Sequence, residues 1–210
     1  MSWLERPPRF FRWLVPGGEF RLSATPPGAA GEEKRVYLTF DDGPIPEVTP
    51  WVLQLLDRYG IKATFFMVAD NARRYPEVCE MVRERGHRIG NHTFHHLQGA
   101  RVSTRRYLRD VAEADRVLHT DLFRPPHGWL RPRQAQALRR RYRIVMYDLV
   151  TRDYSHRLDA AEVFGNVRRY ARPGAIIVFH DSLKSWPRLR EALPQSIEWL
   201  ISRGYTFHPL

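Results

Sequence analysis

Residues 36–44 read Val-Tyr-Leu-Thr-Phe-Asp-Asp-Gly-Pro, and this stretch decides how the rest of the chain is interpreted. Its first five residues are apolar or β-branched, a composition typical of a buried strand. Two carboxylates follow the strand at once, and Gly43-Pro44 then turns the chain sharply. The stretch therefore predicts a buried strand that ends in acidic side chains.

Strands and helices alternate from this point to the end of the chain. Strands are expected at residues 36–40, 62–68, 87–90, 121–123, 143–149, 175–179 and 205–208, and helices at 49–59, 76–86, 103–118, 132–141, 160–172 and 189–203. About seven strands separated by helices indicate parallel strands joined by crossovers. Polar residues repeatedly follow the strands, where α/β barrels build their sites. The pattern favours a barrel-like α/β domain.

The chain of 210 residues has the length of one domain. A segment rich in Pro, Gly and small residues at 23–33 separates an N-terminal arm and linker, residues 1–33, from the main domain, residues 34–210. The arm carries Trp3, Phe10, Phe11, Trp13 and Leu14 beside Arg6, Arg9 and Arg12. These residues could contact a membrane surface, but covering an open end of the domain is the favoured interpretation.

The composition restricts the class of protein, the kind of metal site and the partners that can be expected. The hydrophobic fraction of 43% and the charged fraction of 27% are typical of globular proteins. Cys79 is the one cysteine, so no internal disulfide and no thiolate metal site can form. The net charge of +11 comes from arginines that we assign to solvated helix faces, and no nucleic acid is expected as a partner because no nucleic-acid motif accompanies them. Without an export signal or an apolar run of roughly 20 residues, a cytoplasmic location is expected, with peripheral membrane association as the alternative.

Residues 91–96, Asn-His-Thr-Phe-His-His, contain two histidines four positions apart, His92 and His96. In a helical turn this spacing puts both imidazoles on one face, while His95 points elsewhere. With one carboxylate from the Asp-Asp pair they form a His₂Asp set that leaves coordination positions open for water. Taken alone, the acidic pair is also a common turn, and histidines at this spacing are more often structural. Together they predict a metal site.

Two further segments carry groups suited to binding and proton transfer. Residues 123–128 place Arg124, a permanent cation, at a strand end and continue into rigid Pro-Pro backbone. His180 lies at the exit of the buried strand 175–179, beside Asp181, where a histidine is well placed to exchange protons. Residues 147–154 contain a carboxylate that could orient this histidine.

In this order and spacing, the five segments resemble the polysaccharide deacetylases, also called the NodB-homology family or carbohydrate esterase family 4. The resemblance covers roughly residues 34–210. It implies a distorted (β/α)₇ barrel and metal-dependent hydrolysis of N-acetyl groups on N-acetylglucosamine-containing glycans such as peptidoglycan or chito-oligosaccharides.

The resemblance also implies a role for each matching residue. Asp41 resembles the catalytic base and His180 the catalytic acid, with Arg124 fixing the base and Asp153 tuning the acid. The remaining positions are the metal ligands Asp42, His92 and His96, and the substrate-binding residues Pro126, His127, Tyr154 and Val178, with His127 acting through its amide N–H. One divalent ion is expected, zinc in the first place, with cobalt or nickel as alternatives.

Three motifs depart from the family pattern. His127 stands where the family usually has Tyr, and residues 150–154 lack the first Asp and the Trp of the family's DxxDW motif. The family's LxH motif reads Val178-Phe179-His180 in this chain. These changes affect the prediction of the substrate's identity more than the prediction of metal binding. Two other functions therefore remain: hydrolysis of a different C–N bond on a small molecule, and glycan binding without turnover.

Overall fold

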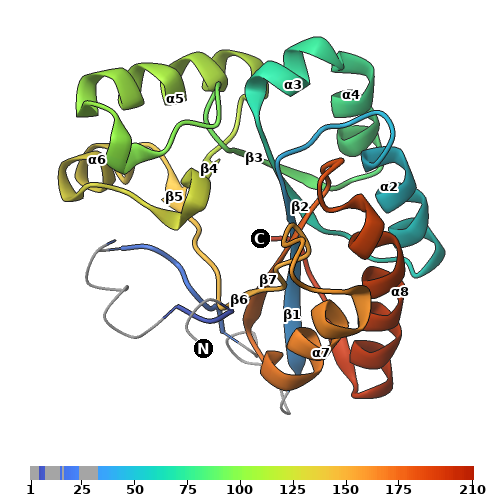
Figure 1. The fold of residues 1–210 in the computed structure, drawn as a ribbon. Coiled ribbons are helices and arrows are strands. Elements are labelled where there is room, and N and C mark those ends of the chain that lie inside the picture. The colour runs from blue at the N-terminus through green and yellow to red at the C-terminus, as the bar shows by residue number, and fades with distance from the viewer. Residues whose placement is uncertain (1–4, 8–14, 16, 24–32) are drawn as a thin grey trace.

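A curled sheet of parallel strands forms the centre of the protein (Figure 1). The structure, a computed structural model, describes residues 5–7, 15, 17–23 and 33–210. The strand order is β5-β4-β3-β2-β1-β7-β6, and β8 pairs with the start of β1. Every pairing between these strands is parallel. The predicted α/β barrel architecture is confirmed, with the strands curled into an open barrel.

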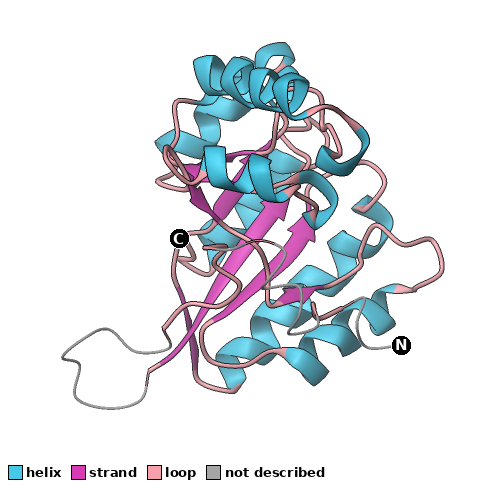
Figure 2. Cartoon of the chain, turned by 90° about the vertical axis from the view of Figure 1, so that its left-hand side faces the viewer, coloured by secondary structure: helices cyan, strands magenta, loops and turns pink. Residues whose placement is uncertain are grey.

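The elements follow the predicted alternation. The strands are β1 (Lys34–Asp41), β2 (Thr64–Met67), β3 (Arg88–Asn91), β4 (Leu122–Phe123), β5 (Arg143–Ile144), β6 (Leu149–Val150), β7 (Ala175–His180) and β8 (Tyr205–Phe207). The helices are α2 (Thr49–Arg58), α3 (Ala69–Arg74), α4 (Pro76–Glu84), α5 (Thr104–Leu118), α6 (Pro132–Leu138), α7 (Ala160–Tyr170) and α8 (Trp186–Ser202), with short 3₁₀ turns η1 (Gly99–Arg101) and η2 (Pro126–Gly128). Figure 2 shows helices above and below the strands.

The alternation of side chains along β1 separates two cores. Val36, Leu38 and Phe40 belong to the large apolar cluster that the sheet forms with the surrounding helices. Tyr37 packs with apolar side chains of the other strands in a small cluster inside the curl of the sheet. Because side chains alternate along a strand, Asp41 at its end belongs to the inner row. The curl therefore brings Asp41 into the mouth of the open barrel.

The predicted strand 143–149 is wrong, because the structure divides it into β5 and β6. Val145 N still donates to Phe123 O of β4, at 2.8 Å, whereas Asp148 N donates to Ile176 O of β7, at 3.0 Å. Residues 145–148 therefore cross from one edge of the sheet to the other. A single straight strand cannot pair with both edges, so the pairing stops on one side before it starts on the other.

Part of the N-terminal segment lies beside the residues that connect β5 to β6 (Figure 1). Glu19 N donates to Ile144 O and Met146 N donates to Glu19 O, both at 2.8 Å, and Leu22 N donates to Gly174 O at 3.0 Å. Phe20 is buried in an apolar cluster that also contains Phe123 and Ile144. The described residues of the predicted arm thus pack against the domain, and the boundary at residues 33 and 34 stays a prediction.

The arm residues for which covering the domain is favoured over membrane contact mostly lie outside the described residues: Trp3, Phe10, Phe11, Trp13, Leu14, Arg9 and Arg12. Arg6 is described, and its guanidinium lies 3.9 Å from the Asp148 carboxylate. Among the residues that the structure describes, no helix has both the length and the apolar character of a membrane span.

Candidate active site

The carboxyl ends of the parallel strands meet at one edge of the sheet, and most of the predicted site residues lie there. β1 ends in Asp41 and β7 in His180, while His92 follows β3 and Arg124 follows β4. They surround a cavity of about 430 Å³. Its lining consists of Asp41, Asp42, His92, His96, Arg124, Pro125, His127, Gly128, Tyr147, Val150, Tyr154, Val178, His180 and Lys184.

The backbone at the acidic pair directs its two carboxylates to different partners. Asp42 adopts a left-handed conformation with φ of 80°, which costs energy in a non-glycine residue. Three contacts hold this turn: Asn71 Nδ2 donates to Asp42 O at 2.9 Å, Val68 N donates to Gly43 O at 3.0 Å, and Gly43 N donates to Asp181 Oδ1 at 3.1 Å. Asp41 faces Arg124, whereas Asp42 faces the two histidines.

The histidine segment is a loop, so the predicted helical turn at residues 92–96 is wrong. Thr93 and His96 have left-handed backbones, with φ of 66° and 54°. Side chains replace the helical hydrogen bonds: Thr93 N donates to Asn91 Oδ1 at 2.8 Å, and Leu97 N donates to Thr93 Oγ1 at 3.1 Å. The sharp bend, rather than helical spacing, brings His92 and His96 together.

Asp110 of α5 anchors the outer side of this loop. Its Oδ2 accepts from Phe94 N at 2.8 Å and from His95 N at 3.1 Å, and its Oδ1 lies 2.6 Å from His95 Nδ1. His95 therefore faces α5 instead of joining the other two histidines. Sequence reasoning missed Asp110, whose signal is an acidic residue on the buried face of an amphipathic helix.

Asp42, His92 and His96 form a possible metal site. Their ligand atoms lie within 4.8 Å of one another, and Asp42 Oδ1 is 3.1 Å from His96 Nε2 and 3.7 Å from His92 Nε2. Atoms bound about 2.0–2.2 Å from one ion lie roughly 3–4 Å apart in a tetrahedral arrangement, so the spacing fits a metal ion. His92 Nδ1 is 2.8 Å from Arg124 O, which fixes its hydrogen there and leaves the Nε2 lone pair facing Asp42.

The charge states of the triad also suit metal binding. Burial lowers the pKa of His92 to about 4, so its ring is neutral at neutral pH. Burial alone would raise the pKa of Asp42, but the hydrogen bond from His96 and the nearby His180 outweigh it and hold this pKa well below its usual range. A neutral imidazole and an ionised carboxylate are the forms that coordinate metals.

Arg124 fixes Asp41 inside the barrel. Its Nη1 donates to Asp41 Oδ1 at 2.7 Å and to Thr39 Oγ1 at 2.8 Å. Its Nη2 donates to Met146 O at 2.9 Å, and the guanidinium lies 4.0 Å above the centre of the Phe66 ring. Burial lowers the pKa of Arg124, although the Asp41 charge opposes this effect. The buried guanidinium thus holds Asp41 in one orientation.

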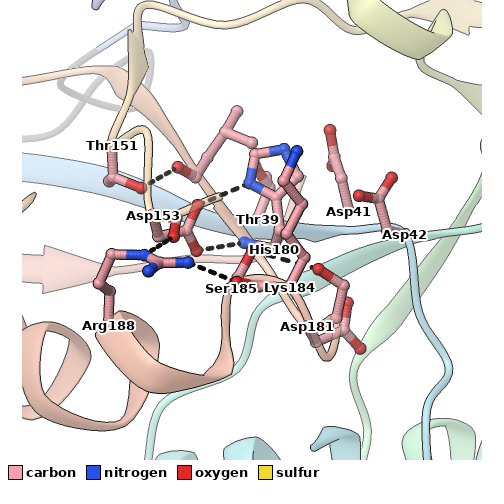
Figure 3. A network of polar contacts seen from close by, with 12 residues as sticks. Thr39, Asp41, Asp42, Thr151, Asp153, His180, Asp181, Lys184, Ser185 and Arg188 are labelled. Carbon is pink, nitrogen blue, oxygen red and sulfur yellow. Dashed lines mark hydrogen bonds and ion pairs between the residues drawn. The ribbon is translucent and has the colours of Figure 1, made fainter. Parts of the chain in front are cut away.

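Asp153 holds His180, which lies next to Asp41 on the neighbouring strand β7 (Figure 3). Asp153 Oδ1 lies 2.8 Å from His180 Nδ1, and Asp153 Oδ2 accepts from His180 N at 2.7 Å. Burial lowers the pKa of His180, but the charge and hydrogen bond of Asp153 outweigh it, and the pKa rises to about 9. His180 is therefore a cation at neutral pH, with a proton available to the cavity.

Asp181 turns away from the cavity and supports the acidic turn. Its Oδ1 accepts from Gly43 N, and its Oδ2 lies 2.6 Å from Thr49 Oγ1 at the start of α2. Burial raises the pKa of Asp181 to about 8, although the Thr49 hydrogen bond lowers it. Asp153, rather than the adjacent Asp181, is thus the partner of His180.

The structure brings together nearly all the residues that the sequence predicts. Of the eleven, nine line the cavity, Asp153 lies directly behind His180, and Pro126 is buried in η2 while Pro125 lines the cavity in its place. Sequence reasoning did not include Pro125, Gly128, Tyr147 or Lys184 in the site. For Lys184, no local motif signalled its place in the cavity wall.

Comparison with known proteins agrees with this geometry. A peptidoglycan-N-acetylglucosamine deacetylase of Bacillus cereus is 32% identical over 154 residues, which make up 70% of this chain and 56% of that protein. The chain thus spans little more than half the length of this relative. A chitooligosaccharide deacetylase of Azorhizobium caulinodans is 34% identical over 85% of this chain and 93% of its own length.

A solved structure shows the same fold. The Bc1960 peptidoglycan N-acetylglucosamine deacetylase superimposes with a TM-score of 0.83 and 27% identity, over 97% of this chain and 94% of that chain. The family model described as polysaccharide deacetylase matches residues 28–144, which is more than half of this chain. The protein therefore belongs to the polysaccharide deacetylase family.

Proposed function

We propose that this protein is a metal-dependent hydrolase that removes the N-acetyl group from an amino sugar and releases acetate. Its substrate is an N-acetylglucosamine-containing glycan such as peptidoglycan or a chito-oligosaccharide. The observation that carries the proposal is one cavity that holds a His₂Asp triad between a fixed carboxylate, Asp41, and an imidazolium, His180. The names of the two relatives support the class of substrate.

Asp42, His92 and His96 hold the divalent ion in this proposal, with zinc first and cobalt or nickel as alternatives. When bound, such an ion supplies Lewis-acid polarisation of a carbonyl and lowers the pKa of a coordinated water toward neutrality. The protein contributes the ligand geometry. The bond from His92 Nδ1 to Arg124 O fixes the ligand ring, and the Arg124 guanidinium fixes the base, so one residue orients both.

Asp41 removes a proton from the attacking water. Its Oδ1 is engaged by Arg124, and the carboxylate lines the cavity beside Asp42, so its orientation toward the water is set before substrate binds. The backbone N–H of His127 donates to the oxygen of the acetyl group as negative charge develops on it. Pre-oriented donors at such a position contribute a large part of catalysis.

His180 donates a proton to the departing amine. An amine is a poor leaving group as an anion, so the C–N bond breaks only when its nitrogen is protonated. Asp153 keeps His180 protonated at neutral pH and orients its ring. Tyr154 packs edge-on against His180 with ring centres 4.9 Å apart, and Val178 lines the cavity nearby. In this proposal Tyr154 and Val178 contact the sugar and the acetyl methyl group, and Pro126 shapes the turn that carries His127.

Acetate release across a panel of glycans tests this proposal. The metal-loaded protein should release acetate from chito-oligosaccharides or from peptidoglycan glycan chains. Asp41→Asn should abolish turnover while elemental analysis still finds the metal, because Asp41 is not a ligand. His92→Ala should lose both, whereas His95→Ala, at a histidine that faces Asp110, should keep the metal.

Three results would contradict the proposal. Acetate release by Asp41→Asn at the unmutated rate would show that Asp41 is not the base. A fully loaded protein that binds glycans but releases no acetate from any of them would indicate a glycan-binding protein. Release of a different product from an amide on a small molecule would indicate hydrolysis of another C–N bond.

A further inference from the structure

Lys184 extends the cavity wall beyond the catalytic groups. It lies between the end of β7 and the start of α8, and its side chain is exposed to solvent yet lines the cavity. Its Nζ is 5.5 Å from the centre of the Tyr154 ring, and that ring packs edge-on against His180. Lys184, Tyr154 and His180 therefore follow one another along one wall, with the exposed Lys184 outermost.

The backbone of Lys184 is fixed to the same structure that positions the catalytic acid. Arg188 Nη2 donates to Lys184 O at 2.5 Å, and Arg188 Nε donates to Asp153 O at 2.6 Å. The adjacent Ser185 is fully buried, and its N–H donates to Ser182 O at 3.1 Å. The ammonium therefore extends from a backbone that is held in place before any ligand arrives.

The positive charge of Lys184 is not neutralised by a carboxylate of the described residues. Arg124 and His180, the other cationic groups of the lining, each face a carboxylate, on Asp41 and Asp153 respectively. Within the described part of the chain, no carboxylate lies within 4.0 Å of the Lys184 ammonium. A divalent ion at the triad would add further positive charge to the same cavity. An anionic ligand group next to Lys184 would meet an attractive potential.

We propose that Lys184 forms a subsite for an anionic group, a carboxylate or a phosphate, carried by the substrate beside the acetylated amino sugar. This inference rests on the proposed deacetylase function. An ammonium is a compact point charge that binds either oxyanion, so the side chain does not distinguish the two. The lactyl carboxylate of muramic acid residues that carry no stem peptide is one source of such a group, whereas chito-oligosaccharides are uncharged. The subsite therefore selects acidic glycans over neutral ones.

The test compares pairs of substrates in which one member carries an anionic group and the other carries a neutral group at the same position. The first pair is a tetrasaccharide of alternating N-acetylglucosamine and N-acetylmuramic acid, and the same tetrasaccharide with its carboxyl groups converted to methylamides. The second pair is N-acetylglucosamine 1-phosphate and its neutral methyl glycoside. Acetate release gives kcat/KM for each compound with the metal-loaded protein, with Lys184→Gln and with Lys62→Gln. Lys62 is the matched control, because it faces Asp57 at 3.7 Å and does not line the cavity.

The protein should prefer one or both charged compounds, and the preference should shrink as ionic strength rises from roughly 0.02 M to 0.5 M. Lys184→Gln should lower the charged-to-neutral ratio of kcat/KM by about three- to tenfold, whereas Lys62→Gln should leave that ratio unchanged. The substrate pair whose charged-to-neutral ratio falls in Lys184→Gln shows whether the subsite binds a carboxylate or a phosphate. An equal ratio in the unmutated protein and in Lys184→Gln overturns the subsite and leaves the deacetylase function intact.

Absence of acetate from every compound overturns the deacetylase function instead. A binding titration of the charged tetrasaccharide and its methylamide then decides the subsite separately. Tighter binding of the charged form that Lys184→Gln abolishes supports the subsite, and equal binding of the two forms overturns it.

Discussion

Arg124 reaches from the end of β4 to the end of β1 and donates to Asp41 Oδ1 at 2.7 Å inside the barrel. Both side chains are nearly inaccessible, with exposed fractions of 2% and 7%. Removing one partner of a buried ion pair leaves the other charge without compensation, which costs about 3–5 kcal/mol. Arg124→Met should therefore lower the free energy of unfolding by about 3–5 kcal/mol in urea denaturation.

Arg133→Met is the matched control, because Arg133 is exposed on α6. Its effect on the free energy of unfolding should stay within about 0.5 kcal/mol. If Arg124→Met were as mild as this control, the buried pair would not hold the inner core together.

Gly43 gives a second prediction, which concerns the support of Asp42, the proposed metal ligand. A Cβ atom on Gly43 would lie closer than 3.0 Å to the carboxylate atoms of Asp181, so a methyl group must displace either Asp181 or the turn. Gly43→Ala should weaken metal binding by about 10- to 100-fold, as loss of an orienting contact commonly does. Isothermal titration with zinc on the metal-free protein measures the change.

The control is Gly165→Ala in α7, where a Cβ meets no atom within 4 Å. Alanine favours a helix interior over glycine, so this variant should gain about 0.5–1 kcal/mol of stability and bind zinc as before. Normal zinc affinity in Gly43→Ala would show that the contact between Gly43 and Asp181 does not position Asp42.

The sequence predicted the residues of this site better than it predicted the local backbone that assembles them. Asp41, Asp42 and His180 follow strands whose apolar runs are plain in the sequence, and parallel strands bring such ends together. The bend between His92 and His96 was predicted as a helical turn. It depends on hydrogen bonds to Asn91 and to the distant Asp110, which local spacing cannot reveal.

Tertiary contacts explain the other differences. The predicted strand 143–149 is divided because its two ends pair with opposite edges of the sheet, and only the complete sheet defines those edges. The short helix α3 was not predicted, because its six residues give too few turns for a clear apolar period. Lys184 enters the site through the position of α8, so no motif around it announced a role.

The pairing of His180 with Asp153 predicts how stability depends on pH. The pKa of His180 is raised from 6.5 to about 9, so the folded protein keeps a proton over this range that the unfolded chain loses. The stabilisation is therefore complete below about pH 6.5 and is lost as pH rises through about 9. For the metal-free protein, His180 contributes up to about 3 kcal/mol to the loss of stability between about pH 6 and about pH 9.5, measured by urea denaturation.

Asp153→Asn removes the anion that raises the pKa of His180, so most of this loss should disappear. Burial raises the pKa of Asp181 to about 8, so in both proteins the fold also loses stability as pH rises from about 4 to about 8, and only the difference between the two proteins is diagnostic. In the metal-loaded protein, Asp153→Asn should also move the alkaline limb of kcat/KM to lower pH. Parallel pH profiles in both proteins would exclude Asp153 as the partner that sets the charge of His180.

The N-terminal segment gives the last prediction, because Glu5 contacts the loop that carries Asp153. Glu5 O accepts from Val150 N at 2.8 Å, and Glu5 Oε1 accepts from Arg152 Nη1 at 2.7 Å. Glu5 is only 8% exposed. Arg152 has a left-handed backbone, with φ of 63°, immediately before Asp153. The ion pair thus holds a strained residue next to the carboxylate that orients His180.

Glu5→Gln keeps the shape of the side chain but removes its charge, so it should lower the free energy of unfolding by about 1–3 kcal/mol. It should also lower kcat without changing the bound metal, because the loop carries Asp153 and supplies none of the triad residues Asp42, His92 and His96. Glu198→Gln, at an exposed carboxylate bonded to Tyr59, is the matched control. Because a purely structural contact would change stability alone, a loss of stability with unaltered kcat would limit Glu5 to packing, whereas a joint loss identifies the N-terminal segment as part of the support for His180.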